Sequence, residues 1–133
     1  MMFSQSTQYA IAALAYLAEQ PSDEVCGAHQ IATAINTPLP YLWKVLGALA
    51  ENGLVISCKG CAGGYRLARD SRKISLNDIL LAMSEGATLS GCILTHWECD
   101  AKRPCHLHRP WDVFRKRLEK TTVADLRRQN CDR

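Results

Sequence analysis

The sequence predicts a mainly α-helical fold with a small β-hairpin wing, that is, a winged helix-turn-helix followed by a long C-terminal dimerisation helix. Two helical segments meet at a tight turn, a glycine-rich hairpin follows them, and an amphipathic segment lies near the C-terminus. With 133 residues, the chain has room for one domain and an appended element. We expect a winged helix-turn-helix over residues 1–83, a metal- or cluster-binding loop over 84–108, and a dimerisation helix with its tail over 109–133.

Two helices are predicted in the N-terminal part. The first covers residues 9–19, is apolar on nearly every side and ends before Pro21, and Ser6 or Thr7 can cap it. A second, short helix covers residues 28–35. Because the first helix is apolar all round, we expect other elements to enclose it.

A tight turn joins the second helix to a third. Asn36 tolerates the left-handed conformation that ends a helix, Thr37 can cap the next one, and Pro38 fits its first position. The buried face of the third helix is expected to contain Leu42, Val45, Leu46 and Leu49. Two helices joined in this way can place the second in the major groove of DNA, although similar corners also occur in all-α cores.

The opposite face of the third helix is predicted to contact DNA. Its residues are Pro40, Tyr41, Trp43, Lys44 and Gly47. Gly47 lacks a side chain and would allow a close approach of the backbone, whereas Trp43 could alternatively pack within the protein.

Residues 54–58 and 65–69 are predicted to form two short strands around a glycine-rich loop, and a hairpin in this position is a wing. The wing residues expected to contact DNA are Lys59, Gly60, Gly63, Gly64 and Arg66. The net charge of +3 is too small to indicate a nucleic-acid binder by itself. DNA binding must therefore depend on where these charges lie.

Two further helices are predicted after the wing. Ser75 and Asp78 resemble a capping box at the start of the first. Its apolar face would contain Leu76, Ile79, Leu80 and Met83. The last helix should begin within a few residues of His108, because Pro110 fits only near a helix start. Its apolar face contains Trp111, Phe114 and Leu118. Such a helix can pack on its own core, but helix-turn-helix proteins usually read two half-sites as dimers, so we predict that this face contacts a second subunit.

The segment from Cys92 to His108 is the hardest to explain as ordinary structure, because it is polar, interrupted by proline and rich in cysteine. Its candidate metal ligands are Cys92, Cys99, Cys105 and His108. Three thiolates and an imidazole suit either an iron-sulfur cluster or structural zinc, and their spacing does not separate the two. His96 and His106 are competing imidazoles.

Seven cysteines without a recognisable signal peptide indicate a cytoplasmic protein with reduced thiols. Cys58 and Cys61 form a second two-cysteine motif, but its place in a hairpin argues against thioredoxin-like catalysis. Oxidation of this pair is a hypothesis for a second switch. Cys26 and Cys131 are given no role. We find no catalytic triad, P-loop or dinucleotide fingerprint, so we predict no catalytic residues, no enzyme activity and no small-molecule substrate.

In order and spacing, these pieces resemble the IscR/NsrR-type family of bacterial winged helix-turn-helix iron-sulfur transcription regulators, from about Phe3 to Leu126. The matching motifs are Tyr9-Ala10, residues 39–42, residues 52–55, Gly63-Gly64-Tyr65, the three-cysteine loop, Cys105-x-x-His108 followed by Trp111, and residues 122–126.

The resemblance implies a homodimeric repressor that binds a palindromic operator in double-stranded DNA, with no membrane partner. A cluster would control its affinity in response to iron status, redox stress or nitric oxide. IscR-like members use a histidine three residues after the last cysteine, as His108 is here, and carry a 2Fe-2S cluster. NsrR-like members can use a carboxylate from the first helix and hold a 4Fe-4S cluster, but this chain has Gln8 there.

The resemblance therefore favours a 2Fe-2S cluster over a 4Fe-4S cluster, with zinc as an alternative. The chain departs from the family in the six residues between Cys92 and Cys99, and in Cys61, which stands where a proline is frequent. Other functions open at this point are a zinc- or thiol-based redox regulator that binds DNA, and a small iron-sulfur electron carrier.

Overall fold

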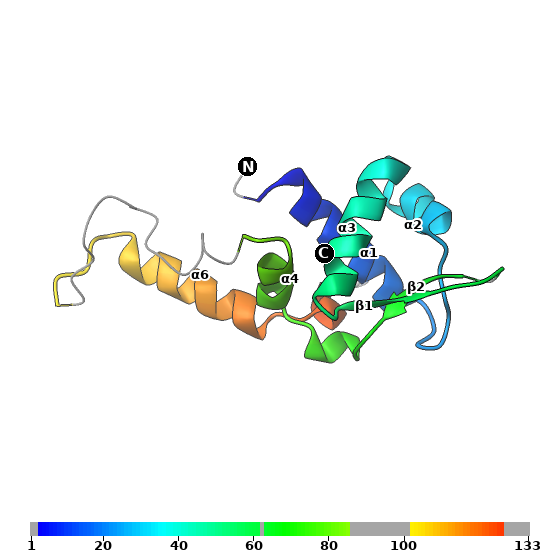
Figure 1. The fold of residues 1–133 in the computed structure, drawn as a ribbon. Coiled ribbons are helices and arrows are strands. Elements are labelled where there is room, and N and C mark those ends of the chain that lie inside the picture. The colour runs from blue at the N-terminus through cyan, green and yellow to red at the C-terminus, as the bar shows by residue number, and fades with distance from the viewer. Residues whose placement is uncertain (1–2, 62, 86–101, 127–133) are drawn as a thin grey trace.

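The computed structural model describes residues 3–61, 63–85 and 102–126. Its elements are α1 (Gln5–Glu19), α2 (Ala28–Ile35), α3 (Leu39–Glu51), β1 (Val55–Cys58), β2 (Gly64–Leu67), η1 (Ser71–Lys73), α4 (Leu76–Ala82), α6 (His108–Lys120) and η2 (Val123–Leu126). The predicted fold class is confirmed: the described residues are mainly helical, with one two-stranded antiparallel hairpin. Figure 1 shows the hairpin and the N-terminal end of α6 at opposite ends of the molecule.

Helix α1 begins earlier than the sequence suggested. Ser4 is its N-cap, and the Ser4 hydroxyl accepts a hydrogen bond from the backbone N–H of Thr7 at 3.3 Å. The predicted caps Ser6 and Thr7 were wrong, because both lie inside the helix and Thr7 is fully buried. The enclosed position expected for α1 is confirmed, since it packs against α2, α3, α4, β2 and η2.

The turn between α2 and α3 follows the prediction at its first residue and departs from it at the next two. Asn36 ends α2 with φ 52° and ψ 55°, the left-handed conformation that was expected. The N-cap of α3 is Pro38 and not Thr37. Thr37 is buried, and its hydroxyl donates to the carbonyl oxygen of Ile35 at 3.4 Å.

The hairpin pairs Val55 with Leu67 and Cys58 with Gly64, so both strands are shorter than predicted. The segment before α2 adds a short antiparallel bridge, in which Cys26 and Tyr65 exchange backbone hydrogen bonds of 2.9 and 2.7 Å. A Cβ atom at Gly64 would collide with the carbonyl oxygen of Cys26. Glycine is therefore required at this strand position by the close approach of two backbones.

The main core lies between α1, α2, α3, the hairpin and α4. Its largest fully buried side chains include Leu14, Ile31, Leu42, Leu46, Leu49, Leu54, Ile74 and Ile79. The four predicted core residues of α3 are all buried, which confirms its helical apolar stripe.

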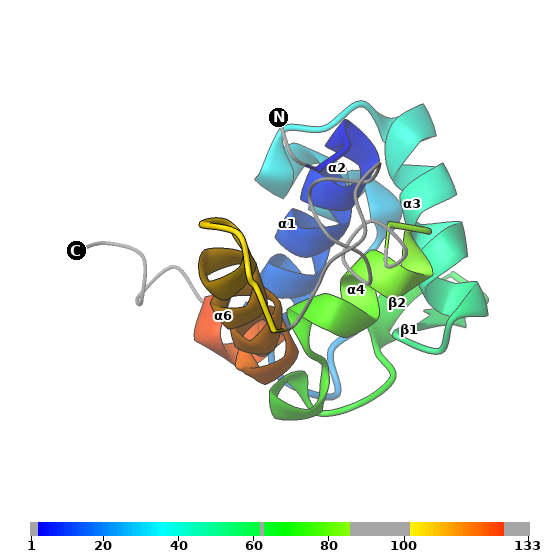
Figure 2. The same cartoon turned by 90° about the vertical axis from the view of Figure 1, so that its left-hand side faces the viewer.

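Helix α6 is joined to the rest of the fold through α4 and through its own C-terminal end. The capping box predicted at Ser75 and Asp78 is present at the start of α4. Ser75 also forms a bridge with Thr122, just after α6. Figures 1 and 2 both show α6 beside α4. In the described parts of the chain, no helix has the length and apolarity needed to cross a bilayer.

Candidate functional site

The outward face of α3 is the first part of the candidate DNA-binding surface. All five residues predicted for it, Pro40, Tyr41, Trp43, Lys44 and Gly47, are exposed. Tyr41 and Trp43 are 56% and 54% exposed, although large aromatic side chains usually contribute to cores. The structure therefore places Trp43 at the surface and not in the core. The buried face of the same helix holds these residues on a rigid support.

The wing loop is the second part of this surface. Lys59 and Gly60 are exposed, and Gly60 has φ +113°, which favours glycine. The backbone N–H of Gly63 donates to the carbonyl oxygen of Gly60 at 2.9 Å. A Cβ atom at Gly63 would lie 2.7 Å from the carbonyl oxygen of Cys58. The glycines thus let the loop fold tightly behind Lys59, and Gly63 and Gly64 have structural reasons to be glycine.

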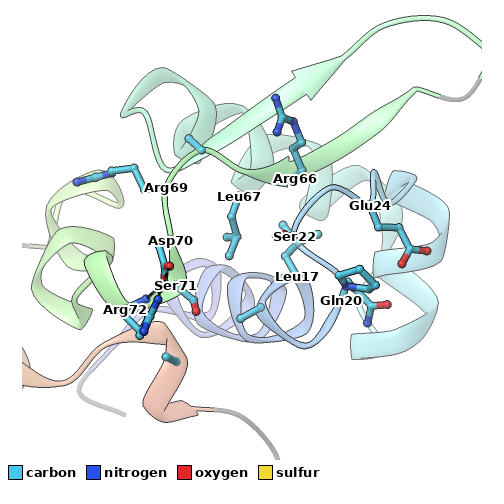
Figure 3. Close-up of a pocket in the computed structure, with 14 residues that line it drawn as sticks. Leu17, Gln20, Ser22, Glu24, Arg66, Leu67, Arg69, Asp70, Ser71 and Arg72 are labelled. Atoms are coloured by element: carbon cyan, nitrogen blue, oxygen red, sulfur yellow. Dashed lines mark hydrogen bonds and ion pairs between the residues drawn. The ribbon is translucent and has the colours of Figure 1, made fainter.

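Arg66 lies at the edge of a separate pocket below the hairpin. The pocket has a volume of about 750 Å³ and is lined by residues of α1, the turn after it, β2, η1 and η2. Figure 3 shows Leu17 and Leu67 near its centre, Arg66 and Glu24 on one side, and Asp70 and Arg72 on another. Arg66 is half-buried and is therefore less accessible to solvent than Lys59, which is exposed.

The Asp70 carboxylate in this pocket is hydrogen-bonded to Arg72. It accepts hydrogen bonds from the backbone N–H of Arg72 at 2.9 Å and from Nη2 of Arg72 at 3.0 Å. The hydrogen bonds from Arg72 lower the pKa of Asp70 from 3.8 to about 2. Asp70 and Arg72 form a neutral pair at pH 7. The other charged residues that line the pocket are Arg66, Arg69 and Glu24, which leaves one net positive charge.

Of the four predicted metal ligands, the described residues include Cys105 and His108, whereas Cys92 and Cys99 lie outside them. Cys105 is exposed and His108 is the first residue of α6. The backbone N–H of His108 donates to the carbonyl oxygen of Cys105 at 3.1 Å. One backbone turn therefore contains a cysteine and, three residues later, a histidine. His106 lies in the same turn and is exposed, and His96 lies outside the described residues.

The three predicted dimerisation residues of α6 contact the same chain. Leu118 is 6% exposed and packs with Leu80 of α4, and Trp111 and Phe114 pack around this pair while half-buried. The Trp111 and Phe114 rings lie 6.0 Å apart between their centres. This small cluster fixes the position of α6 on α4.

Sequence reasoning missed two apolar residues that α6 and the preceding turn present to solvent. Val113 is 67% exposed and Leu107 is 45% exposed. Val113 lies off the stripe of Trp111, Phe114 and Leu118, and the residues three and four positions away on its side of the helix are Arg109, Pro110, Lys116 and Arg117. The sequence feature that could have identified Val113 is a β-branched apolar residue on a helical face that is otherwise mostly charged.

The remaining described thiols differ in accessibility. Cys26 is fully buried, and this burial, with a smaller contribution from Glu24, raises the pKa of its thiol. Cys58 is half-buried at the end of β1, and Cys61 is exposed in the wing loop. The raised pKa keeps Cys26 protonated and hence poorly reactive.

An exposed recognition helix, a basic glycine-rich wing and a supporting three-helix core define a winged helix-turn-helix DNA-binding protein. The chain belongs to the Rrf2 family, whose sequence profile, described as "Iron-dependent Transcriptional regulator", matches residues 3–129. This confirms the resemblance noted from the sequence motifs.

Relatives over nearly the whole length are transcription regulators. The "HTH-type transcriptional regulator NsrR" of Halalkalibacterium halodurans is 30% identical over 131 residues, covering 95% of this chain and 90% of its own. The solved structure of CymR, "the Global Cysteine Regulator of B. subtilis", is similar with a TM-score of 0.81 and 28% identity, covering 93% of this chain and 94% of its own. IscR of T. potens is similar with a TM-score of 0.72 and 25% identity, covering 93% and 84%. The protein is therefore a DNA-binding transcription regulator and not an enzyme.

Proposed function

We propose that this regulator binds a palindromic operator as a cytoplasmic homodimer, and that an iron-sulfur cluster held by Cys92, Cys99, Cys105 and His108 controls its affinity for DNA. The observation that carries the proposal is the backbone turn that joins Cys105 to His108 at the start of α6. The family description as iron-dependent, and the likeness to NsrR and IscR, support it.

The donor chemistry of this turn fits a cluster. Thiolate and imidazole are the ligands that iron-sulfur centres accept, and the exposed Cys105 thiol is open to a group bound outside the helix. At the alternative ligand position in α1, the Gln8 side chain donates to the carbonyl oxygen of Phe3 at 3.1 Å. An amide used in this way is a weak substitute for a carboxylate. This arrangement favours His108 as the fourth ligand and a 2Fe-2S cluster over a 4Fe-4S cluster.

On the DNA side, α3 would enter the major groove with its exposed first turns. We assign base and sugar contacts to Tyr41 and Trp43, and phosphate contacts to Lys44 and Lys59. The other proposed contacts are Pro40, Gly47, Gly60, Gly63, Gly64 and Arg66. Since the described ion pairs lie elsewhere, the charges of Lys44 and Lys59 are available for phosphates.

The dimer would form along α6. Trp111 and Phe114 are only half-buried within one chain, and Val113 is mostly exposed, so α6 retains apolar surface for a partner. In the proposed division, residues 1–83 bind DNA, 84–108 hold the cluster and 109–133 form the dimer helix and tail. The isologous contact of a two-fold dimer would then match two half-sites.

Helices α6 and α4 connect the turn of Cys105 and His108 to α3. The C-terminal end of α6 is held by backbone hydrogen bonds from Leu76 N–H to the Thr121 carbonyl at 2.9 Å, and from Val123 N–H to the Ile74 carbonyl at 2.8 Å. Helix α4 contacts both α6 and α3. When bound, the cluster would supply a redox- and nitric-oxide-sensitive link between its ligands. Loss of the cluster would release Cys105 and His108 and would thereby change the position of α6.

Anaerobic purification with iron, sulfide and zinc analysis tests the proposal. We expect iron and acid-labile sulfide in the wild type, their loss in Cys105→Ala, and their retention in Cys131→Ser as a matched control. Gel shifts on the protein's own promoter with the cluster present and removed should give different affinities. Zinc without sulfide would instead support the structural zinc alternative, and equal affinities would refute control by the cluster.

A second candidate function follows from the similarity to CymR. Its TM-score of 0.81 spans nearly all of both chains, and CymR is described as a cysteine regulator. A regulator of this second kind would respond to sulfur supply and would not need iron. Iron-free protein whose operator binding is unaffected by Cys105→Ala would favour this candidate.

A further inference from the structure

The wing contains two cysteines that the proposed cluster does not use. Cys58 is the last residue of β1 and Cys61 lies in the loop that follows. We propose that these two thiols form a redox site in which a low-molecular-weight disulfide converts them to an intraloop disulfide and thereby weakens DNA binding. The effect on DNA rests on the proposed contact between the wing and phosphates.

The loop bends between the two cysteines. Gly60, between them, has φ +113°, and the chain reverses so that the N–H of Gly63 reaches the Gly60 carbonyl at 2.9 Å. Gly63 packs closely enough against the carbonyl oxygen of Cys58 to exclude any side chain. A disulfide needs Cα atoms roughly 4.4–6.8 Å apart. Only Lys59 and Gly60 separate the two cysteines, and the bend at Gly60 shortens the path between them, so this loop can meet that requirement.

The two thiols differ in accessibility, because Cys61 is exposed whereas Cys58 is half-buried. An attacking thiol must be accessible, and the second must reach it from within the protein. This asymmetry assigns Cys61 to the first step and Cys58 to the second.

The two steps balance in atoms and electrons. The Cys61 thiolate attacks one sulfur of the oxidant, breaking its S–S bond, forming a mixed disulfide and releasing one thiolate. The Cys58 thiolate then attacks the Cys61 sulfur, forming the protein disulfide and releasing the second thiolate. Two electrons pass from the protein to the oxidant, and the protons of the two protein thiols end on the two released thiols.

The consequence for DNA follows from Lys59, which lies between the two cysteines and is exposed. A disulfide between Cys58 and Cys61 would close a ring that contains Lys59. The ring would fix the backbone on both sides of Lys59 and change the direction in which its ammonium group points. Loss of this phosphate contact in each protomer should weaken operator binding by about tenfold at moderate salt.

Trypsin separates the two cysteines and allows the bond to be detected directly. Cleavage after Lys59 leaves Cys58 in residues 45–59 and Cys61 in residues 60–66, each with a single cysteine. Full-length protein is treated with oxidised glutathione, blocked with N-ethylmaleimide and digested. We expect the two peptides to be linked, and to separate on reduction. In Cys58→Ser, glutathione should remain on Cys61. Absence of the linked peptide from the oxidised wild type would overturn the proposal.

Operator binding is then compared before and after oxidation in the wild type and in a Cys58→Ser/Cys61→Ser double variant. The variant retains the cysteines of the proposed cluster, so only the wing differs. We expect the wild type to lose about tenfold more affinity than the variant, with recovery on reduction. Equal losses in both proteins would overturn the effect on DNA. The peptide measurement needs no DNA, so a linked peptide in a protein that fails to bind its operator when reduced would count against the proposed function and not against the disulfide.

Discussion

Replacing Lys59 with alanine tests whether the wing contacts the phosphate backbone. Lys59 is exposed at the start of the wing loop, and among the described residues no acidic side chain pairs with it. Its charge is therefore not neutralised within the described fold. A lysine in this position should displace counterions from DNA on binding, and this makes the affinity dependent on salt.

The expected change in salt dependence follows from the number of phosphate contacts that the substitution removes. Each phosphate contact contributes about 0.9 to the slope of log K against log salt, so a symmetrical dimer of Lys59→Ala should lose about 1.8. Between 50 and 200 mM salt, such a change alters the ratio of wild-type to variant affinity by about tenfold. The advantage of the wild type should be largest at low salt.

Fluorescence anisotropy with a labelled operator at four or more salt concentrations measures this slope. Lys120→Ala is a matched control, because it removes the same charge from an exposed position in the last turn of α6. The wing assignment is refuted if Lys59→Ala keeps the wild-type slope, or if Lys120→Ala lowers the slope by the same amount.

Three further outcomes are expected. Cys105→Ala should abolish the visible absorption of anaerobically purified protein, whereas His106→Ala should retain it, and equal spectra would exclude Cys105 as a ligand. Leu118→Ala should lower the free energy of unfolding by about 2–4 kcal/mol in urea titrations with an unchanged m-value, because Leu118 is 6% exposed against α4; a change below about 0.5 kcal/mol would show that this cluster does not hold α6. Arg72→Ala should return the pKa of Asp70 from about 2 toward 3.8 in an NMR titration. Because the folded pKa is depressed, the Asp70 interaction stabilises the protein above about pH 4 and is lost as the pH falls toward 2.

The recognition helix could be predicted from the sequence because its signals were local and consistent. Leu42, Val45, Leu46 and Leu49 share one helical face, and burial of all four leaves the opposite face to solvent. Asn36 supplied an independent signal, since few residues other than glycine adopt its left-handed conformation. Agreement between periodicity and turn chemistry fixed both the helix and its orientation.

The helix starts were harder to predict because several residues could serve as caps. Ser4, Ser6 and Thr7 all have hydroxyl groups, and only tertiary packing selects among them. Thr7 is buried against the core, where its hydroxyl lies 3.2 Å from that of Ser4. Likewise, burial of Thr37 removes it from the start of α3. At α3 packing outweighed the cap preference, which contributes only about 1 kcal/mol, whereas at α1 Ser4 met that preference.

The candidate site was predictable in part. Spacing placed Cys105 and His108 in one turn, and the structure shows that turn at the start of α6. Sequence periodicity could also identify the apolar face of α6, but it could not say which surface covers that face. The structure resolves part of this question, since Leu118 packs on Leu80 of the same chain while Trp111 stays half-buried. Which surface covers the apolar face of a helix depends on contacts between residues that are far apart in the sequence.

The attachment of α6 suggests how binding at its first turn could alter DNA affinity. The 13 residues of α6 extend about 20 Å, from the turn of Cys105 and His108 to the backbone bridge at Thr122. Allosteric couplings are typically about 1–3 kcal/mol, equivalent to roughly 5- to 150-fold in affinity. A single buried leucine such as Leu118 contributes a similar or larger amount, about 2–4 kcal/mol. Repacking of one contact between α6 and α4 is therefore large enough to carry the whole signal, and no rearrangement of the main core is required.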